Sequence, residues 1–112
     1  QGIGMALFEK HIFDPQYGLS ATRRLYTAKP PTYLDVPLEM DWDAVNQPDP
    51  YSPVGSRGIG EPPMGAAAAA VLCAIADALG GHLFRRTPVT KDMILNAAEG
   101  RQQSIRPLEL HA

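Results

Sequence analysis

A single glutamate stands inside a short segment rich in glycine and proline near the middle of the chain. Residues 55–63 read GSRGIGEPP, so Glu61 follows Gly60 directly and precedes Pro62 and Pro63. Glycine lets the backbone approach a bound group closely and proline fixes the chain, so this carboxylate is held stiffly. A rigidly placed carboxylate in a partly desolvated pocket can act as a general base. The local residues alone still favour a simpler interpretation, a solvated glutamate on a loop.

The glycines of this segment also suggest a phosphate-binding loop, but the surrounding sequence argues against it. A nucleotide-binding turn follows an apolar strand and opens directly into a helix. Here residues 47–53 contain three prolines and make a poor strand, and the glycine spacing is Gly-x-x-Gly-x-Gly. Two further prolines, Pro62 and Pro63, delay the helix that we expect next. We therefore expect no tight dinucleotide binding by this chain.

The other reactive side chains do not form a recognisable site. Cys73 is the only cysteine and falls in an apolar helical stretch, where a small core residue is the simpler interpretation. The histidines are His11, His82 and His111. They lack metal-ligand spacing, so surface or capping roles suit them better. Asp41 and Asp43 fall on one face of an expected strand, which favours solvated side chains over a catalytic carboxylate pair.

Positioning Glu61 requires regular elements, and helices are expected at the two ends of the chain. Residues 1–12 read as an amphipathic helix. Residues 64–79 contain five consecutive alanines and end at Gly80, which predicts a buried helix with a glycine C-cap. A last helix follows Thr90, which suits an N-cap, and has Asp92 in its first turn.

The middle of the chain carries the alternation of apolar and polar residues that is typical of strands. This alternation occurs in residues 19–29 and again in residues 38–45. Prolines in residues 30–37 and 46–53 impose extended or turning backbone between and after these segments. The pattern predicts an α+β fold in which two or three helices pack on a small sheet.

Length and composition describe one small globular domain and exclude several classes of function. The chain has 112 residues, of which 45% are hydrophobic and 20% charged, and a formal net charge of −2. No basic stripe for nucleic acid is present, and one cysteine can form neither a disulfide nor a thiolate cluster for iron–sulfur or zinc. The longest apolar run is shorter than the roughly 20 residues of a membrane span. We therefore expect no nucleic-acid and no membrane partner.

Several motifs in a fixed order together resemble the molybdenum hydroxylases, the family of xanthine dehydrogenase and aldehyde oxidoreductase. GIGEPP before a helix of small residues is similar to the glycine–glutamate–proline segment of that family. The further matches are QGIGMALFE at residues 1–9, KPPTYLDVP at residues 29–37, SRG at residues 56–58, AIADALG at residues 74–80 and TPVT at residues 87–90. Arg57 departs from the lysine often found there, which keeps the charge but changes the donor geometry.

The resemblance implies that residues 1–100 are the C-terminal part of a larger molybdopterin-binding domain and that residues 101–112 are a C-terminal tail. In that family a molybdenum–molybdopterin cofactor supports attack by water-derived oxygen on the carbon of an aldehyde or N-heterocycle. Glu61 corresponds to the base that deprotonates the molybdenum-bound hydroxyl. Gln1 corresponds to a hydrogen-bonding contact to the pterin, and Gly60 to a backbone position close to the metal centre. Glu61 and Gln1 should then share one concave surface.

The resemblance also implies partners, because the family's large subunit is several times longer than this chain. We expect the remainder of the molybdopterin-binding subunit to complete the site, and iron–sulfur clusters and flavin to lie on other segments or subunits. Without them the isolated chain should be inactive and expose its site residues, or form a homodimer that covers an apolar patch. The expected location is the cytoplasm, with the periplasm as an alternative. A second interpretation is a non-catalytic α+β interaction module derived from this family.

Overall fold

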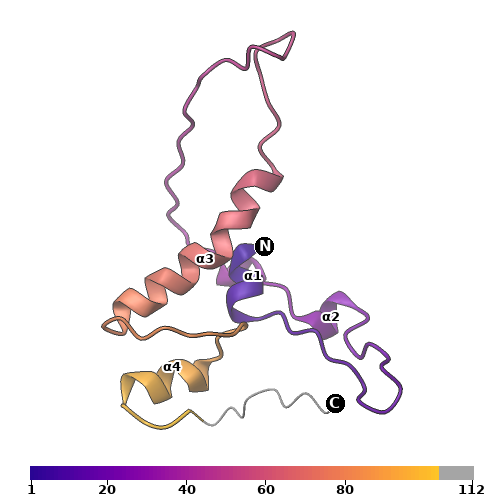
Figure 1. The fold of residues 1–112 in the computed structure, drawn as a ribbon, viewed down its shortest axis with the longest axis vertical. Coiled ribbons are helices and arrows are strands. Elements are labelled where there is room, and N and C mark those ends of the chain that lie inside the picture. Colours follow the sequence, from indigo (N-terminus) through magenta and orange to yellow (C-terminus); the bar gives the residue numbers. More distant parts are fainter. Residues whose placement is uncertain (104–112) are drawn as a thin grey trace.

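The computed structural model describes residues 1–103, which form helices joined by long irregular connections (Figure 1). The elements are α1 (Gly2–Leu7), α2 (Leu25–Ala28), the 3₁₀ helix η1 (Tyr33–Asp35), α3 (Glu61–Ala78) and α4 (Lys91–Ala98). None of these helices is long and apolar enough to cross a bilayer. Most of the tail predicted at residues 101–112, including His111, lies outside the described residues.

α3 is the longest helix, and its first turn explains where it begins. Pro62 and Pro63 lie in this turn, where the missing N–H of proline costs nothing and its fixed φ suits the helix. The helix therefore begins at Glu61, three residues before the start that the alanine pattern predicts. The alanines that follow have the highest helix propensity of all residues and continue the helix without interruption.

The C-terminal end of α3 is closed by two glycines. The N–H of Gly81 donates to the carbonyl of Ala76 at 2.7 Å, and the N–H of Gly80 donates to the carbonyl of Asp77 at 3.0 Å. Gly80 and Gly81 have φ values of +68° and +95°, which other residues rarely adopt. The two bonds satisfy carbonyls that would otherwise be left open at the helix end. The predicted glycine C-cap is confirmed.

The described residues cover only one face of α3. Its shielded positions recur about every four residues and form one stripe along the helix. They are Ala67, Ala68, Val71, Leu72, Ile75 and Ala76. Cys73 lies on the other face and is exposed, so the predictions of a helix buried all round and of Cys73 as a core residue are wrong for these residues. The physical reason is that α1 is the one described helix that packs directly on α3, and it covers a single side.

α1 lies against α3 at a distance that requires glycine. A Cβ atom built on Gly2 would overlap the Cβ of Ala67 and lie 2.8 Å from the carbonyl carbon of that residue. A Cβ built on Gly4 would lie 2.7 Å from the Cδ of Pro31, on the chain that leads into η1. Carbon atoms in ordinary contact stay about 3.5–4.0 Å apart, so neither position has room for a side chain. The two glycines therefore allow α1 to sit between α3 and the proline-rich connection.

A small core is formed by residues of α1, of the end of α3, of the segment that leads into α4 and of α4 itself. Its buried apolar side chains belong to Ala6, Ala76, Val89 and Met93. The N–H of Val89 donates to the carbonyl of Ala6 at 2.7 Å, which satisfies an open carbonyl in the last turn of α1. α4 follows at once, with Thr90 as its N-cap and Asp92 in its first turn, as predicted. The bond between Val89 and Ala6 ties the segment before α4 to α1.

The strands that we expected are not formed within residues 1–103. Residues 19–29 include α2 instead, and residues 38–45 run without a neighbouring strand, while one isolated bridge joins Phe13 and Ser20. A strand needs partners for its backbone groups and for its apolar face, and the described residues provide neither. The small sheet is therefore not shown, and the α+β class stays a prediction.

The first helix is also shorter than the pattern of residues 1–12 predicts. α1 ends at Leu7, and the next residue, Phe8, has a φ of −126° and a ψ of −46°. An amphipathic helix is stabilised mainly by burying its apolar face. Ile12, which would lie on that face, is 46% exposed, so the described residues offer no surface that would extend the helix this far.

Between η1 and α3 the chain makes a long excursion, residues 36–60, which we call the arm. Figure 1 shows that it rises away from the helices and returns directly into the first turn of α3. At its foot, the Asp35 carboxylate accepts hydrogen bonds from the N–H of Thr32 at 2.8 Å and from the Thr32 hydroxyl at 2.9 Å. These bonds hold the η1 turn closed, and they lower the pKa of Asp35 below its ordinary value.

Replacing Gly2 with alanine should separate α1 from α3. The added methyl group overlaps Ala67, and overpacking of this kind costs about 1–3 kcal/mol of unfolding free energy. Gly65→Ala is the matched control, because a Cβ there meets no atom within 4 Å. That control should gain up to about 1 kcal/mol from helix propensity. Urea unfolding followed by circular dichroism measures both changes, and equal midpoints for the two variants would contradict the close packing.

The Asp35 turn should lose stability in acid. The pKa of Asp35 is lowered in the folded state, so its hydrogen bonds to Thr32 contribute their full stability above the unfolded-state pKa of about 3.9. This contribution to the free energy of unfolding is lost as the pH falls through the lower folded-state pKa. An NMR titration of the Asp35 carboxyl should therefore give a pKa below 3.8. Thr32→Val removes the hydroxyl donor and should raise that pKa. An Asp35 pKa at or above the ordinary value would refute the assigned bonds.

Candidate active-site segment

Glu61 is the first residue of α3 and follows Gly60, the N-cap. From the sequence we expected Pro62 and Pro63 to separate the carboxylate from the helix body, and the structure corrects this because both prolines belong to the first turn. Glu61 thus lies within the positive end of the helix dipole, which favours a negative charge there. The residue is exposed, and the ion pairs of residues 1–103 do not involve it.

Two glycines just before Glu61 have free space beside their backbone. A Cβ atom built on Gly58 or on Gly60 would meet no atom within 4 Å. Gly60 has a φ of −62°, which any residue can adopt, so neither backbone conformation nor local packing requires glycine at this position. What glycine provides here is room for another group to approach the chain. The role predicted for Gly60 stays a prediction, and this open space is what that role requires.

Gln1 is brought to the same helix as Glu61 by the packing of α1. Its neighbour Gly2 meets Ala67, six residues beyond Glu61 on α3. This separation corresponds to about 9 Å along the helix axis at a rise of about 1.5 Å per residue. The Gln1 carbonyl accepts the N–H of Met5 at 3.0 Å, while the residue itself is exposed. The structure therefore places Gln1 and Glu61 on neighbouring parts of one helix pair.

The described residues do not enclose Glu61. An open hollow of about 390 Å³ lies beside α1 and is lined by Met5, Glu9, Lys10, His11, Thr22, Ala28 and Thr87. None of the three predicted site residues (Gln1, Gly60 and Glu61) lines it, and all three are exposed. Residues 1–103 thus do not by themselves form the concave surface that the assignment of Glu61 requires. Any such surface needs additional polypeptide.

The histidines of the described chain make local contacts. The His11 ring lies 3.2 Å from the Ser20 hydroxyl and 4.4 Å, between ring centroids, from Phe13. The His82 ring lies 4.7 Å from that of Phe84 in an edge-on arrangement. Within residues 1–103, no group of three or more histidine, cysteine, aspartate or glutamate side chains could hold a metal ion.

The tip of the arm is held by Asp49, whose role the sequence analysis missed. One carboxylate oxygen accepts the N–H of Tyr51 at 3.0 Å, and the other lies 2.8 Å from both Nε and Nη2 of Arg57. The N–H of Asp49 also donates to the Gly55 carbonyl at 2.9 Å, which closes the turn. The Asp-Pro dipeptide at residues 49–50 is a turn signal that could have revealed this role. Arg57 therefore fixes the loop that leads toward Glu61.

No protein-family model matches the chain, but individual proteins do. It is 34% identical over 102 residues to the large subunit of nicotine 6-hydroxylase from Paenarthrobacter nicotinovorans, a match that covers 89% of this chain and 12% of that protein. It is 40% identical over 80 residues to the xanthine dehydrogenase molybdenum-binding subunit of Escherichia coli O157:H7, a match that covers 70% of this chain and 10% of that protein. It is 34% identical over 97 residues to the aldehyde oxidoreductase of Megalodesulfovibrio gigas, a match that covers 87% of this chain and 10% of that protein.

These relatives support the resemblance to molybdenum hydroxylases at a coarse level. By their names they are a hydroxylase subunit, a molybdenum-binding dehydrogenase subunit and an aldehyde oxidoreductase. The class of protein to which the chain is similar is therefore the molybdenum-containing oxidoreductases. The chain spans only about a tenth of the length of each of these relatives. Similarity over such a segment concerns one part of those proteins.

Removing the Asp49 carboxylate should loosen the arm tip. In Asp49→Ala, amide exchange at Tyr51 and Gly55 should accelerate roughly tenfold, since a hydrogen bond to a charged group contributes about 1.5 kcal/mol or more. Asp43→Ala is the matched control, because its carboxylate accepts only the N–H of the adjacent Ala44, at 2.7 Å. Hydrogen-exchange NMR follows these amides. Unchanged exchange in Asp49→Ala would show that the turn does not depend on this side chain.

Proposed function

We propose that the chain is the C-terminal part of the molybdenum-binding subunit of a molybdenum hydroxylase, with Glu61 as the general base. The reaction is the oxidation of an aldehyde or N-heterocycle with oxygen derived from water. The observation that carries this proposal is the Gly-Glu-Pro-Pro segment at the start of α3, in a chain 34–40% identical to oxidoreductase subunits. Because the chain spans a tenth of those relatives, most of the catalytic machinery would lie on other polypeptide.

The molybdenum–molybdopterin cofactor is compatible with the groups that this chain offers. Gly58 and Gly60 leave open space beside the backbone, and Gln1 presents an exposed amide with both donors and an acceptor. In this family the dithiolene of the pterin holds the metal, so this chain needs to supply no metal ligand. When bound, the cofactor supplies the metal centre that activates oxygen from water and accepts electrons.

Glu61 would take up the proton that the oxygen nucleophile loses. A general base must be held within hydrogen-bond reach of that proton, and the two prolines after Glu61 restrict the backbone that carries it. The ionised carboxylate is the form able to accept a proton. The other polypeptide would exclude bulk water and strengthen the electrostatic interactions at this carboxylate.

Electron transfer would take place on other segments or subunits. The chain has one cysteine, whereas an iron–sulfur cluster is held by four thiolates, and none of the glycine segments is a flavin or nucleotide fingerprint. The similar nicotine 6-hydroxylase chain is named a large subunit, which implies a smaller companion in that protein. We accordingly propose the rest of the molybdopterin-binding subunit, with iron–sulfur and flavin subunits or domains, as partners.

A non-catalytic interaction module remains the competing function, and the exposure of Glu61 within residues 1–103 is the observation that favours it. The two functions differ in metal content. A catalytic subunit isolated from its native host should contain molybdenum and pterin in near-stoichiometric amounts, whereas an interaction module should contain neither.

In the complete enzyme, Glu61→Gln should abolish turnover. The amide keeps the size of the side chain but cannot accept the proton, so kcat should fall by at least about 10²–10⁴-fold. Molybdenum and pterin content should stay near the unmodified level, because Glu61 is not a metal ligand in this proposal. Glu99→Gln is the control, since Glu99 pairs with Arg101 just beyond α4. Turnover of Glu61→Gln equal to that of Glu99→Gln would refute the general-base role.

A further inference from the structure

The rising part of the arm carries a strand-like pattern that nothing in the described structure uses. From residue 38 to residue 43, apolar and acidic residues alternate strictly. We call Leu38, Met40 and Trp42 the apolar face, and Glu39, Asp41 and Asp43 the acidic face. Because successive side chains of an extended chain point to opposite sides, each set would line one face of a strand.

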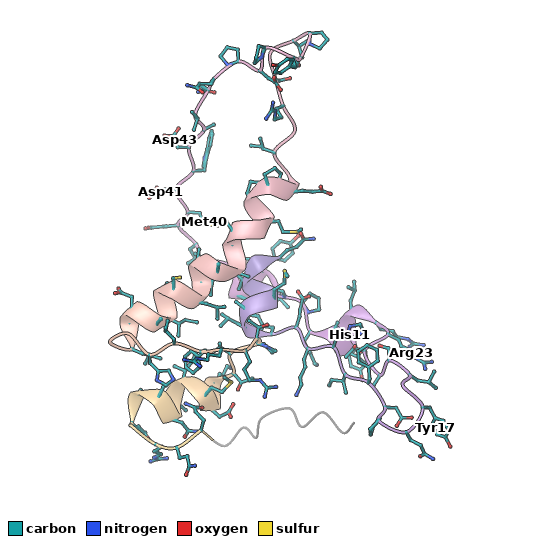
Figure 2. All side chains as sticks on the ribbon, in the orientation of Figure 1. His11, Tyr17, Arg23, Met40, Asp41 and Asp43 are labelled. Atoms are coloured by element: carbon teal, nitrogen blue, oxygen red, sulfur yellow. The ribbon has the colours of Figure 1, made fainter. Side chains whose placement is uncertain are left out.

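The apolar face is exposed to an unusual degree. Trp42 is 91% exposed, Met40 is 65% exposed and Leu38 is fully exposed. Figure 2 shows Met40, Asp41 and Asp43 along the stretch of the arm that stands away from the helices. A tryptophan and two large aliphatic side chains within five residues are a strong driving force for burial. Contiguous exposed apolar residues of this kind mark interaction sites.

The backbone of the same stretch is unpaired as well. Within residues 1–103, no backbone–backbone hydrogen bond involves residues 36–48, although bonds close the turns on either side at Asp35 and Asp49. Apart from Ala44, whose N–H donates to the Asp43 carboxylate, and Pro37, which has no N–H, residues 36–44 offer the open backbone groups that an edge strand presents to a partner. The side-chain pattern and the open backbone therefore both indicate pairing with a strand.

We propose that residues 36–44 add as a strand to the open edge of a β-sheet in the remaining polypeptide of the molybdenum-binding subunit. The apolar face packs into the core under that sheet, and the acidic face meets lysine or arginine side chains of the neighbouring strand. This identity of the partner rests on the proposed function. Strand addition provides main-chain hydrogen bonds for affinity, and the alternate side chains provide specificity.

Charge selects this partner over a second copy of the chain. If two copies paired antiparallel about Asp41, Asp41 would face its own counterpart and Glu39 would face Asp43. Like charges directly opposite one another destabilise a pair of strands. A register shifted by one residue avoids this repulsion but puts the acidic face of one copy beside the apolar face of the other. A neighbouring strand with basic residues removes both conflicts.

Hydrogen–deuterium exchange tests the pairing directly. Residues 36–45 should be compared in the isolated chain and in the native assembly, purified from the host through an affinity tag on this chain. We expect exchange in the assembly to be slower by at least about 100-fold, since paired sheet amides open rarely. Exchange at the free-chain rate in both samples would overturn the proposal. The proposal would also be overturned if these residues exchanged slowly in the isolated chain and still more slowly at higher protein concentration. That result would assign the strand partner to a second copy of the chain.

Paired variants test the two faces. Trp42→Ser should reduce the polypeptide that co-purifies with the chain by at least about tenfold, a loss of about 1.4 kcal/mol in affinity. Tyr17→Ser, which removes an exposed aromatic ring on the side of α2 away from the arm, should not (Figure 2). The double variant Asp41→Lys with Asp43→Lys should act like Trp42→Ser, while Asp77→Lys on the exposed face of α3 should not. Equal recovery in all variants would refute the docking of these faces.

Metal analysis of the same assembly separates this inference from the proposed function. Protection of residues 36–45 without molybdenum or pterin would leave the strand pairing standing and remove the hydroxylase assignment. Molybdenum and pterin in an assembly whose residues 36–45 are not protected would support the hydroxylase assignment and overturn the strand pairing.

Discussion

The close approach of Gly2 to Ala67 is the contact on which the described structure depends. It lets α1 lie directly on the alanine-rich helix, and this position allows the carbonyl of Ala6 to receive the N–H of Val89. That bond ties the segment just before α4 to α1. The same contact brings the opening glutamine to the helix that begins with Glu61. One glycine without a side chain thus links the packing to the candidate site.

Elements set by local chemistry were predictable from the sequence, and elements that need distant partners were not. The glycine end of α3 and the Thr90 start of α4 depend on residues within a few positions, and both were predicted correctly. The two expected strands were not found, because alternation identifies a strand without supplying its neighbour. The exposure of Cys73 was missed for a related reason, since an apolar helix pattern cannot tell which faces are covered.

The candidate site divides in the same way. Sequence patterns singled out Glu61, Gly60 and Gln1 as candidates, and the structure added that Glu61 belongs to the first helical turn and that Gln1 lies beside the same helix. Residues 1–103 do not enclose these three residues, so the sequence of this chain could not predict a pocket around them. The Asp49–Arg57 pair at the arm tip was missed although its Asp-Pro signal was present.

The two prolines after Glu61 have a consequence for the hydrogen bonds that its carboxylate can accept. A helix start normally offers several free N–H groups, and these bind anions or fold back on an acidic side chain. Pro62 and Pro63 remove two of those donors. The helix start therefore has fewer backbone donors with which to bind an anion. It also has fewer with which to bind the Glu61 carboxylate itself. Such a carboxylate can accept a hydrogen bond or a proton from a group outside this helix.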